Sequence, residues 1–230
     1  MNDTELFQNS VPCHPGAASP AVCPLNAAQL GVYLECAEMP DSVKYNCPAR
    51  AKLPEGTELP RFIAAVEAAI AKCPAFCVTI GVPDGVPSML YSEKKIAVEE
   101  VSAENIDAEL CRFLRPFDLE RGPLCRFELC RSAEGLAFLH DIHHVIFDGT
   151  SSKNFIDEIA LAYEGENIPP EELTIFDLAQ AEAKNGGEAS ERAKAFFDAS
   201  LNGIDTDSKP IPDAVEENAA SGAGHFRVSA

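Results

Sequence analysis

The sequence is short of basic side chains and has no long apolar run. Its 230 residues include 18 lysines and arginines against 37 aspartates and glutamates, which gives a net charge of −19. Because nucleic-acid binding needs clustered lysines and arginines, this balance excludes nucleic acid as an expected partner. No apolar run reaches the roughly 18 residues that span a bilayer, and the polar, acidic start Met1–Glu5 is no signal peptide. We therefore expect a cytoplasmic protein that does not enter membranes.

Paired cysteine clusters are also missing, although the chain has nine cysteines. An odd number without a secretory signal argues against a disulfide framework. The thiols that lie in apolar-periodic segments, where they pack as small hydrophobes, are Cys36, Cys111, Cys125 and Cys130. The nearest approach to metal-ligand spacing is Cys73-x3-Cys77 with His140-x2-His143, and no second paired cluster accompanies it. We predict that no metal is bound.

What the sequence does contain is a seven-residue stretch suited to chemistry, His-His-Val-Ile-Phe-Asp-Gly at residues 143–149. Alternation over Leu136–His144 predicts a strand in which the two histidines face opposite sides. Asp148 and Gly149 then predict a turn before a helix over Ser151–Tyr163. An imidazole held at such a junction can transfer protons near neutral pH. Residue types alone leave two interpretations open, a catalytic histidine and a structural pair or partial metal site.

Periodicity elsewhere predicts a mixture of helices and hairpin strands. Helices are expected from Asn26 to about Met39, from Thr57 to about Cys73 and from Ser102 to about Leu114. Strands are expected over Phe76–Val82, Pro87–Tyr91, Ile96–Val101 and Leu124–Arg131, the last forming a hairpin with the histidine strand. This mixture favours an α+β sandwich.

Four segments, in the same order, resemble motifs of one acyltransferase superfamily. Residues 143–149 are similar to the HHxxxDG motif shared by the condensation domains of nonribosomal peptide synthetases and by chloramphenicol acetyltransferase. The segments that resemble other condensation-domain motifs are Pro24–Leu34 (the opening helix motif), Tyr45–Pro48 (Tyr-Asn-x-Pro) and Arg115–Arg126 (PFDLxxGPLxR). The four together indicate a condensation domain.

The resemblance implies a fold and a division of the chain. The fold is a chloramphenicol acetyltransferase-like α+β sandwich, in which helices flank a mixed sheet. About eighty residues follow the histidine motif, as in the first lobe of a two-lobed condensation domain, so the chain resembles the N-terminal lobe alone. We expect residues 25–203 to form this lobe, residues 1–24 to be an irregular N-terminal segment, and residues 204–230 to be an inter-lobe connection or a mobile tail.

The resemblance also implies a reaction and its partners. An acyl or peptidyl group passes from a carrier-protein thioester to an acceptor amine, giving an amide, or to a hydroxyl, giving an ester. His144 is then the catalytic residue, which removes a proton from the amine or orients it. His143 packs on the opposite face, Asp148 holds the loop through a charge pair, and Gly149 lets the acyl group approach the backbone. No cofactor is expected to bind directly, because phosphopantetheine on the carrier protein presents the substrates; the missing C-terminal lobe is the other partner.

One departure from the family's pattern affects the motif itself. Cys77 stands where the family has an arginine that pairs with the motif's aspartate. Asp148 therefore needs another base, such as Arg126, or backbone amides at the start of the following helix.

Two other functions stay open, a coenzyme A-dependent acyltransferase of the same superfamily and a non-catalytic, condensation-like binding module. The resemblance implies that donor and acceptor meet in a tunnel between the two lobes, and a tunnel that lacks one of its two walls cannot position both substrates. We therefore expect the isolated chain to be weak or inactive as a catalyst.

Overall fold

The computed structural model describes residues 11–12, 22–91, 95–169 and 171–203. The chain divides into two compact units, residues 1–185 and 186–230. The strands are β1 (Val11–Pro12), β2 (Val22–Pro24), β3 (Asn46–Lys52), β4 (Val78–Gly81), β5 (Ser88–Tyr91), β6 (Lys95–Ile96), β7 (Val98–Ser102), β8 (Cys125–Ser132) and β9 (Gly135–His143). The helices are α1 (Ala27–Glu38), α2 (Leu59–Lys72), α3 (Ile106–Phe113), α4 (Gly149–Glu164) and α5 (Ile175–Ser200), with short 3₁₀ helices η1 (Pro74–Cys77) and η2 (Pro83–Gly85).

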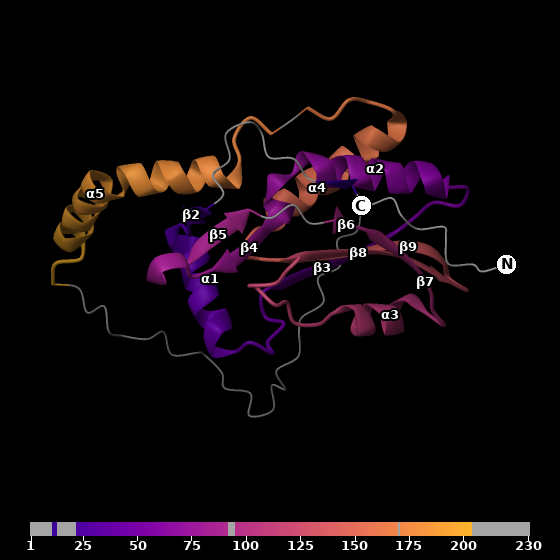
Figure 1. Cartoon of the computed structure of the whole chain (residues 1–230), viewed down its shortest axis with the longest axis horizontal. Helices are drawn as coiled ribbons and strands as arrows, with labels where there is room; N and C mark the ends of the chain where they lie inside the picture. The colour runs from indigo at the N-terminus through magenta and orange to yellow at the C-terminus, as the bar shows by residue number, and fades with distance from the viewer. Residues whose placement is uncertain (1–10, 13–21, 92–94, 170, 204–230) are drawn as a thin grey trace. The chain divides into compact units, whose positions relative to one another are not determined.

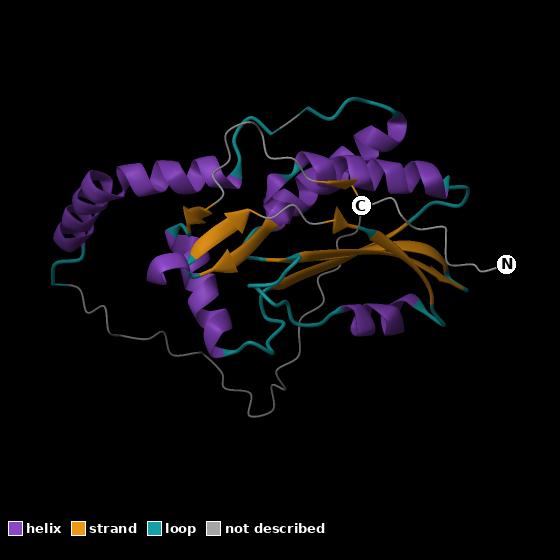
Figure 2. Cartoon of the chain, in the orientation of Figure 1, coloured by secondary structure: helices purple, strands orange, loops and turns teal. Residues whose placement is uncertain are grey.

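A mixed four-stranded sheet is the centre of the first unit. Its strand order is β3-β9-β8-β7, with β7 parallel to β8 and the other pairs antiparallel. Helices α2 and α4 lie over one face of this sheet and α3 lies under the other (Figure 1). Figure 2 shows the resulting layers of helix, sheet and helix, and beside them the smaller sheet β2-β5-β4. This is the α+β layering that the sequence predicts.

Strict alternation along β8 and β9 explains why both faces of the sheet are covered. On one face, Phe127, Phe138 and Ile142 join a core completed by α2 and α4. On the other face, Leu139 and Cys130 pack in a smaller cluster with α3. Because successive side chains of a strand point to opposite sides, the two layers bury nearly every residue of β9.

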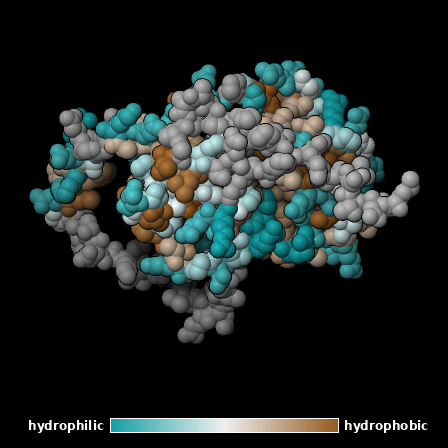
Figure 3. Space-filling view, viewed as in Figure 1, coloured by the Kyte–Doolittle hydropathy of each residue, from teal (hydrophilic) through white to brown (hydrophobic). Residues whose placement is uncertain are grey.

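Helix α1 contributes little to this core. Its start agrees with the sequence prediction, since Asn26 caps it and forms a capping box with Gln29. Apolar residues remain at the surface around α1, β2 and β5 (Figure 3), and among them Leu34 is 55% exposed. The one buried side chain of α1 is polar, that of Gln29.

Local sequence signals gave the right kind of element more often than the right boundary. The strand expected over Ile96–Val101 is divided into two, β6 and β7, which have different partners. The helix expected to begin at Ser102 begins after Asn105, whose side chain accepts a hydrogen bond from the Ala108 N–H. Phe76 belongs to η1 and not to the following strand. Strand β3 was not predicted at all.

The expectations for the two ends of the chain fall largely outside the described residues. Of the segment 1–24, the structure describes only β1 and β2, which are strands and not irregular chain. The segment 204–230, expected to be a connection or tail, lies outside the described residues.

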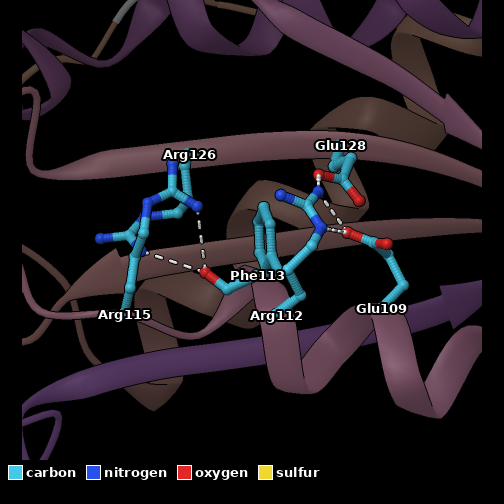
Figure 4. A network of polar contacts seen from close by, with 6 residues as sticks. All are labelled: Glu109, Arg112, Phe113, Arg115, Arg126 and Glu128. Carbon is cyan, nitrogen blue, oxygen red and sulfur yellow. Dashed lines mark hydrogen bonds and ion pairs between the residues drawn. The ribbon is translucent and has the colours of Figure 1, made fainter.

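A cluster of charged groups joins α3 to the underside of the sheet. Glu128 of β8 is 1% exposed and faces Glu109 of α3, while Arg112 forms ion pairs with both carboxylates (Figure 4). Burial, chiefly, and the nearby Glu109 raise the pKa of Glu128 to about 7, although Arg112 acts in the opposite direction. Because this pKa is higher in the folded than in the unfolded chain, ionisation of Glu128 destabilises the fold progressively as the pH rises from the ordinary carboxyl range to about 7.

We expect Glu128→Gln to be more stable relative to the wild type at pH 8 than at pH 5. Glutamine keeps an acceptor for Arg112 and removes the buried charge, so the relative gain at pH 8 is about 1 to 3 kcal/mol. Urea unfolding at the two pH values measures it, with the exposed Glu134→Gln as the control. If the free energy of unfolding of Glu128→Gln differs from that of the wild type by the same amount at both pH values, the raised pKa of Glu128 is contradicted.

Candidate active site

His144 occupies the first position of the turn that connects β9 to α4. Its side chain is exposed, whereas its backbone N–H donates to the Tyr45 carbonyl oxygen at 2.8 Å. The rings of Tyr45 and His144 meet edge to face, with centroids 6.4 Å apart. A strand end therefore fixes the backbone of His144 and leaves its imidazole open to a ligand.

His144 borders an open pocket of about 870 Å³. The pocket lies among the start of α1, η1, the start of α4 and residues 171–181, and Phe76, Val145 and Phe155 are among its apolar walls. The acidic residues that line it are Asp148, Glu158, Glu171, Glu172 and Asp177, and among the described residues its lining includes no lysine or arginine. Burial raises the pKa of Glu158 and of Glu171. The described lining is therefore acidic and offers no lysine or arginine to a phosphate.

His143 points away from this pocket and is buried, with 4% exposure. Its Nδ1 accepts a hydrogen bond from the Val145 N–H at 3.1 Å, so the neutral ring carries its proton on Nε2, which lies 3.6 Å from the Cys36 Sγ. Burial, chiefly, together with the nearby His144 and Arg126, lowers the pKa of His143 to about 4. A neutral, buried His143 thus holds the turn that carries the exposed His144.

Asp148 is the N-cap of α4. Its carboxylate accepts hydrogen bonds from the Ser151 N–H at 2.7 Å and the Ser151 hydroxyl at 2.8 Å, and these bonds lower the pKa of Asp148. The charge pair expected for Asp148 is wrong: within the described residues it forms no ion pair, and Cys77 is buried in the core. Of the two replacements considered for the missing arginine, the structure has the backbone amide and not Arg126.

Gly149 is the first residue of α4 and faces open space. A Cβ built on it would meet no atom within 4 Å. The fold itself therefore does not require a glycine at this position. The expectation that an acyl group approaches the backbone here fits that space.

Arg126 binds a different carboxylate, that of Asp141. Asp141 is fully buried on β9, and its Oδ2 lies 3.7 Å from the Arg126 guanidinium and accepts a 2.7 Å hydrogen bond from Asn46 of β3. Burial raises the pKa of Asp141 to about 6, although Asn46 and Arg126 lower it. The Arg126 guanidinium also lies 3.7 Å above the ring of Phe117, which packs edge to face on His143. Polar groups from three strands thus lie beneath the histidine motif.

Three residues without an expected role lie around the motif in the structure, Gln29, Asn46 and Asp141. Asp141 could have been noticed, because alternation puts a charged side chain on the same covered face as His143. The roles of Gln29 and Asn46 depend on contacts with residues 116 and 95 positions away, and no local pattern reports such contacts.

Neither a metal cluster nor a membrane-spanning helix is found among these elements. In the part of the chain that the structure describes, no three His, Cys, Asp or Glu side chains come together as metal ligands. No helix among the described residues is long and apolar enough to cross a membrane.

A fixed backbone, an exposed imidazole and an adjoining pocket are the arrangement that an acid–base histidine requires, and here they lie on an α+β sandwich. The sequence profile described as "Condensation domain" matches residues 20–226. Surfactin synthase subunit 2 of Bacillus subtilis (strain 168) is 30% identical over 175 residues, which are 74% of this chain and 5% of that protein. Bacitracin synthase 3 of Bacillus licheniformis is 28% identical over 160 residues, which are 68% of this chain and 2% of that protein.

Solved structures give the same fold. The starter condensation domain of rhizomide synthetase RzmA matches with a TM-score of 0.69 at 20% identity, over 81% of this chain and 49% of that chain. The condensation domain of the monacolin K polyketide synthase MokA matches with a TM-score of 0.69 at 15% identity, over 79% of this chain and 43% of that chain.

The chain belongs to the condensation-domain family, and its fold is the chloramphenicol acetyltransferase-like α+β sandwich of that family. It spans about half the length of these solved condensation domains and only 2 to 5% of the two curated relatives named above.

Proposed function

We propose that this chain is the N-terminal lobe of a condensation domain, which forms an amide or ester bond by transferring an acyl or peptidyl group from a carrier-protein thioester to an acceptor. The observation that carries the proposal is the placement of His144: its imidazole is exposed beside the pocket while its backbone is fixed by Tyr45. The carrier protein domains and a C-terminal lobe are the proposed partners, and the cytoplasm is the proposed compartment.

The chemistry proposed for His144 is a proton transfer. The neutral acceptor amine attacks the thioester carbonyl, so that a C–N bond forms and, through a tetrahedral intermediate, the C–S bond breaks. His144 takes or orients the proton that the amine loses, and the departing thiolate of phosphopantetheine gains a proton. His143 and Asp148 support the motif by holding the turn and the start of α4. Gly149 leaves room for the acyl group.

Two kinds of relatives support this reaction class. The sequence relatives are named as a bacitracin synthase and a surfactin synthase subunit. A variant of the rhizomide starter domain is described as a complex with C8-CoA and Leu-SNAC, an acyl thioester and an aminoacyl thioester bound together on that protein. We propose the same pairing of an acyl donor with an aminoacyl acceptor here, with phosphopantetheine carrying both and no cofactor bound directly.

The charge of the pocket favours this function over a coenzyme A-dependent acyltransferase. Coenzyme A carries phosphates that proteins bind through arginine, lysine or backbone amides. In the part of the chain that the structure describes, the pocket beside His144 is lined by five carboxyl groups and by no lysine or arginine. A carrier protein would keep the phosphate of its single phosphopantetheine arm near its own surface, away from these carboxylates.

An assay of amide formation tests the proposal. We expect the chain joined to a C-terminal lobe, supplied with a carrier-bound acyl donor and an aminoacyl acceptor, to release the amide product detected by mass spectrometry. The chain alone should be at least about a hundredfold slower, because misplacement by about 1 Å already costs that much. Full-rate product from the chain alone would overturn the single-lobe assignment. No product from the joined protein with any acceptor, while the carriers still bind, would favour the non-catalytic binding module.

A further inference from the structure

The side chain of Gln29 connects α1 to the turn that carries His144. Gln29 is 6% exposed, and its Nε2 donates to the Val145 carbonyl oxygen at 3.0 Å and contacts the Met89 sulfur at 3.3 Å. Its Oε1 accepts a hydrogen bond from the Asn26 N–H at 3.1 Å, as part of the capping box. One side chain thus serves two purposes through two different atoms, with Oε1 capping α1 and Nε2 holding the turn.

The turn is held on both sides of His144. The peptide N–H of His144 donates to the Tyr45 carbonyl oxygen. The next residue, Val145, has both of its peptide groups bound by side chains: its N–H donates to Nδ1 of His143, and its C=O accepts from Gln29. A buried carbonyl oxygen that loses its donor incurs a desolvation penalty, so the turn would move towards another donor if Gln29 could not donate.

We propose that Gln29 is a positioning residue for His144: its Nε2 donor fixes the Val145 peptide and thereby the direction of the His144 imidazole. This inference rests on the proposed catalytic role of His144. It explains why the only buried side chain of an otherwise surface helix is an amide. It also gives α1 a function at the site, because the helix holds the base in place from the wall of the pocket.

The two purposes of Gln29 can be separated by one nearly isosteric change. In Gln29→Glu, the carboxylate still accepts from the Asn26 N–H, and glutamate is a normal third residue of a capping box. It has no donor for Val145, and it places a negative charge against a carbonyl oxygen. Gln29→Met is neutral and of similar size and also lacks the donor. The matched control is Asn105→Ala, which removes the asparagine N-cap of α3 on the other face of the sheet.

The experiment compares these variants in the amide-forming assay of the joined, two-lobed protein. We expect both Gln29 variants to lower kcat by about 10- to 100-fold with KM changed less than about threefold, because bound substrate meets a misplaced base. Asn105→Ala should lower the unfolding midpoint and leave kcat within about twofold. In NMR spectra of ¹³C-labelled histidine, the His144 ring resonances should shift or broaden in the Gln29 variants and not in Asn105→Ala.

Failure of this inference is distinguishable from failure of the proposed function. An unchanged kcat in Gln29→Met, in a protein that loses its activity when His144 is replaced, would overturn the role of Gln29 alone. Equal loss of kcat in Asn105→Ala would show that general destabilisation explains the effect, and would also overturn it. Activity that survives replacement of His144 would instead contradict the proposed function.

Discussion

Replacing His144 with alanine is expected to slow amide formation by the joined, two-lobed protein by about 10²- to 10⁴-fold, the usual contribution of a positioned acid–base group. The fold should tolerate the change. The ring is exposed and contacts the ring of Tyr45, while the hydrogen bond that fixes this position comes from the backbone and remains in the variant. We expect the free energy of unfolding to change by about 0.5 kcal/mol or less.

The measurement for His144→Ala combines kcat and KM for amide formation with urea unfolding of the same preparation. Lys153→Ala is the control, since it removes an exposed side chain from the first turns of α4. The expected pattern is a large loss of kcat in one variant and wild-type stability in both. Retention of wild-type kcat in His144→Ala would show that binding and orientation alone drive the reaction, and His144 would no longer be the catalytic residue.

The sequence identifies the parts of this site that are close together along the chain. The hairpin β8–β9 and the start of α4 follow from alternation, a turn and a capping aspartate, all of which are local signals. Strand β3 was missed because Pro48 argues against a strand, and only its place at the edge of the sheet makes the proline acceptable. Residues 46–52 form a strand because they pair with β9, and the sequence of β3 alone does not reveal that pairing.

The same dependence on strand pairing explains why the sequence alone did not identify the partner of Asp148. The family pattern correctly indicated that Asp148 lacks its usual arginine, and physical reasoning gave two possible replacements. Choosing between them required knowing that Arg126 lies beside Asp141 in the register of β8 and β9. The carboxylate that pairs with a basic side chain on a strand depends on which residue lies opposite it on the neighbouring strand. Only the folded sheet shows that residue.

Arg126→Ala is expected to cause the largest loss of stability among the changes considered. The arginine is 11% exposed at its side chain and is the basic partner of the fully buried Asp141. It also donates to the carbonyl oxygens of Phe113 at 3.1 Å and Pro116 at 3.3 Å (Figure 4 shows the bond to Phe113). Leaving a buried carboxylate without its counter-charge costs about 3 to 5 kcal/mol, which should appear in full at pH 8.

The pH dependence of Arg126→Ala separates charge from packing. Burial already raises the pKa of Asp141 to about 6, and loss of Arg126 raises it further. Because the folded pKa exceeds the unfolded one, the ionised form destabilises the fold, so the loss in the variant should shrink as the pH falls from 8 to 5. The second change Asp141→Asn removes the unpaired charge and should restore much of the stability at pH 8.

Urea unfolding of Arg126→Ala, Asp141→Asn and the double variant at both pH values completes this test as a double-mutant cycle. A loss that is equal at pH 5 and pH 8 and is not rescued by Asp141→Asn would assign the effect to the lost carbonyl bonds and the contact with Phe117. Either result bears on the site, because the ring of Phe117 lies between Arg126 and His143. If the loss depends on charge, Arg126 supports the histidine motif by keeping Asp141 ionised and paired. If it depends on packing, Arg126 supports the motif by holding the ring of Phe117 against His143.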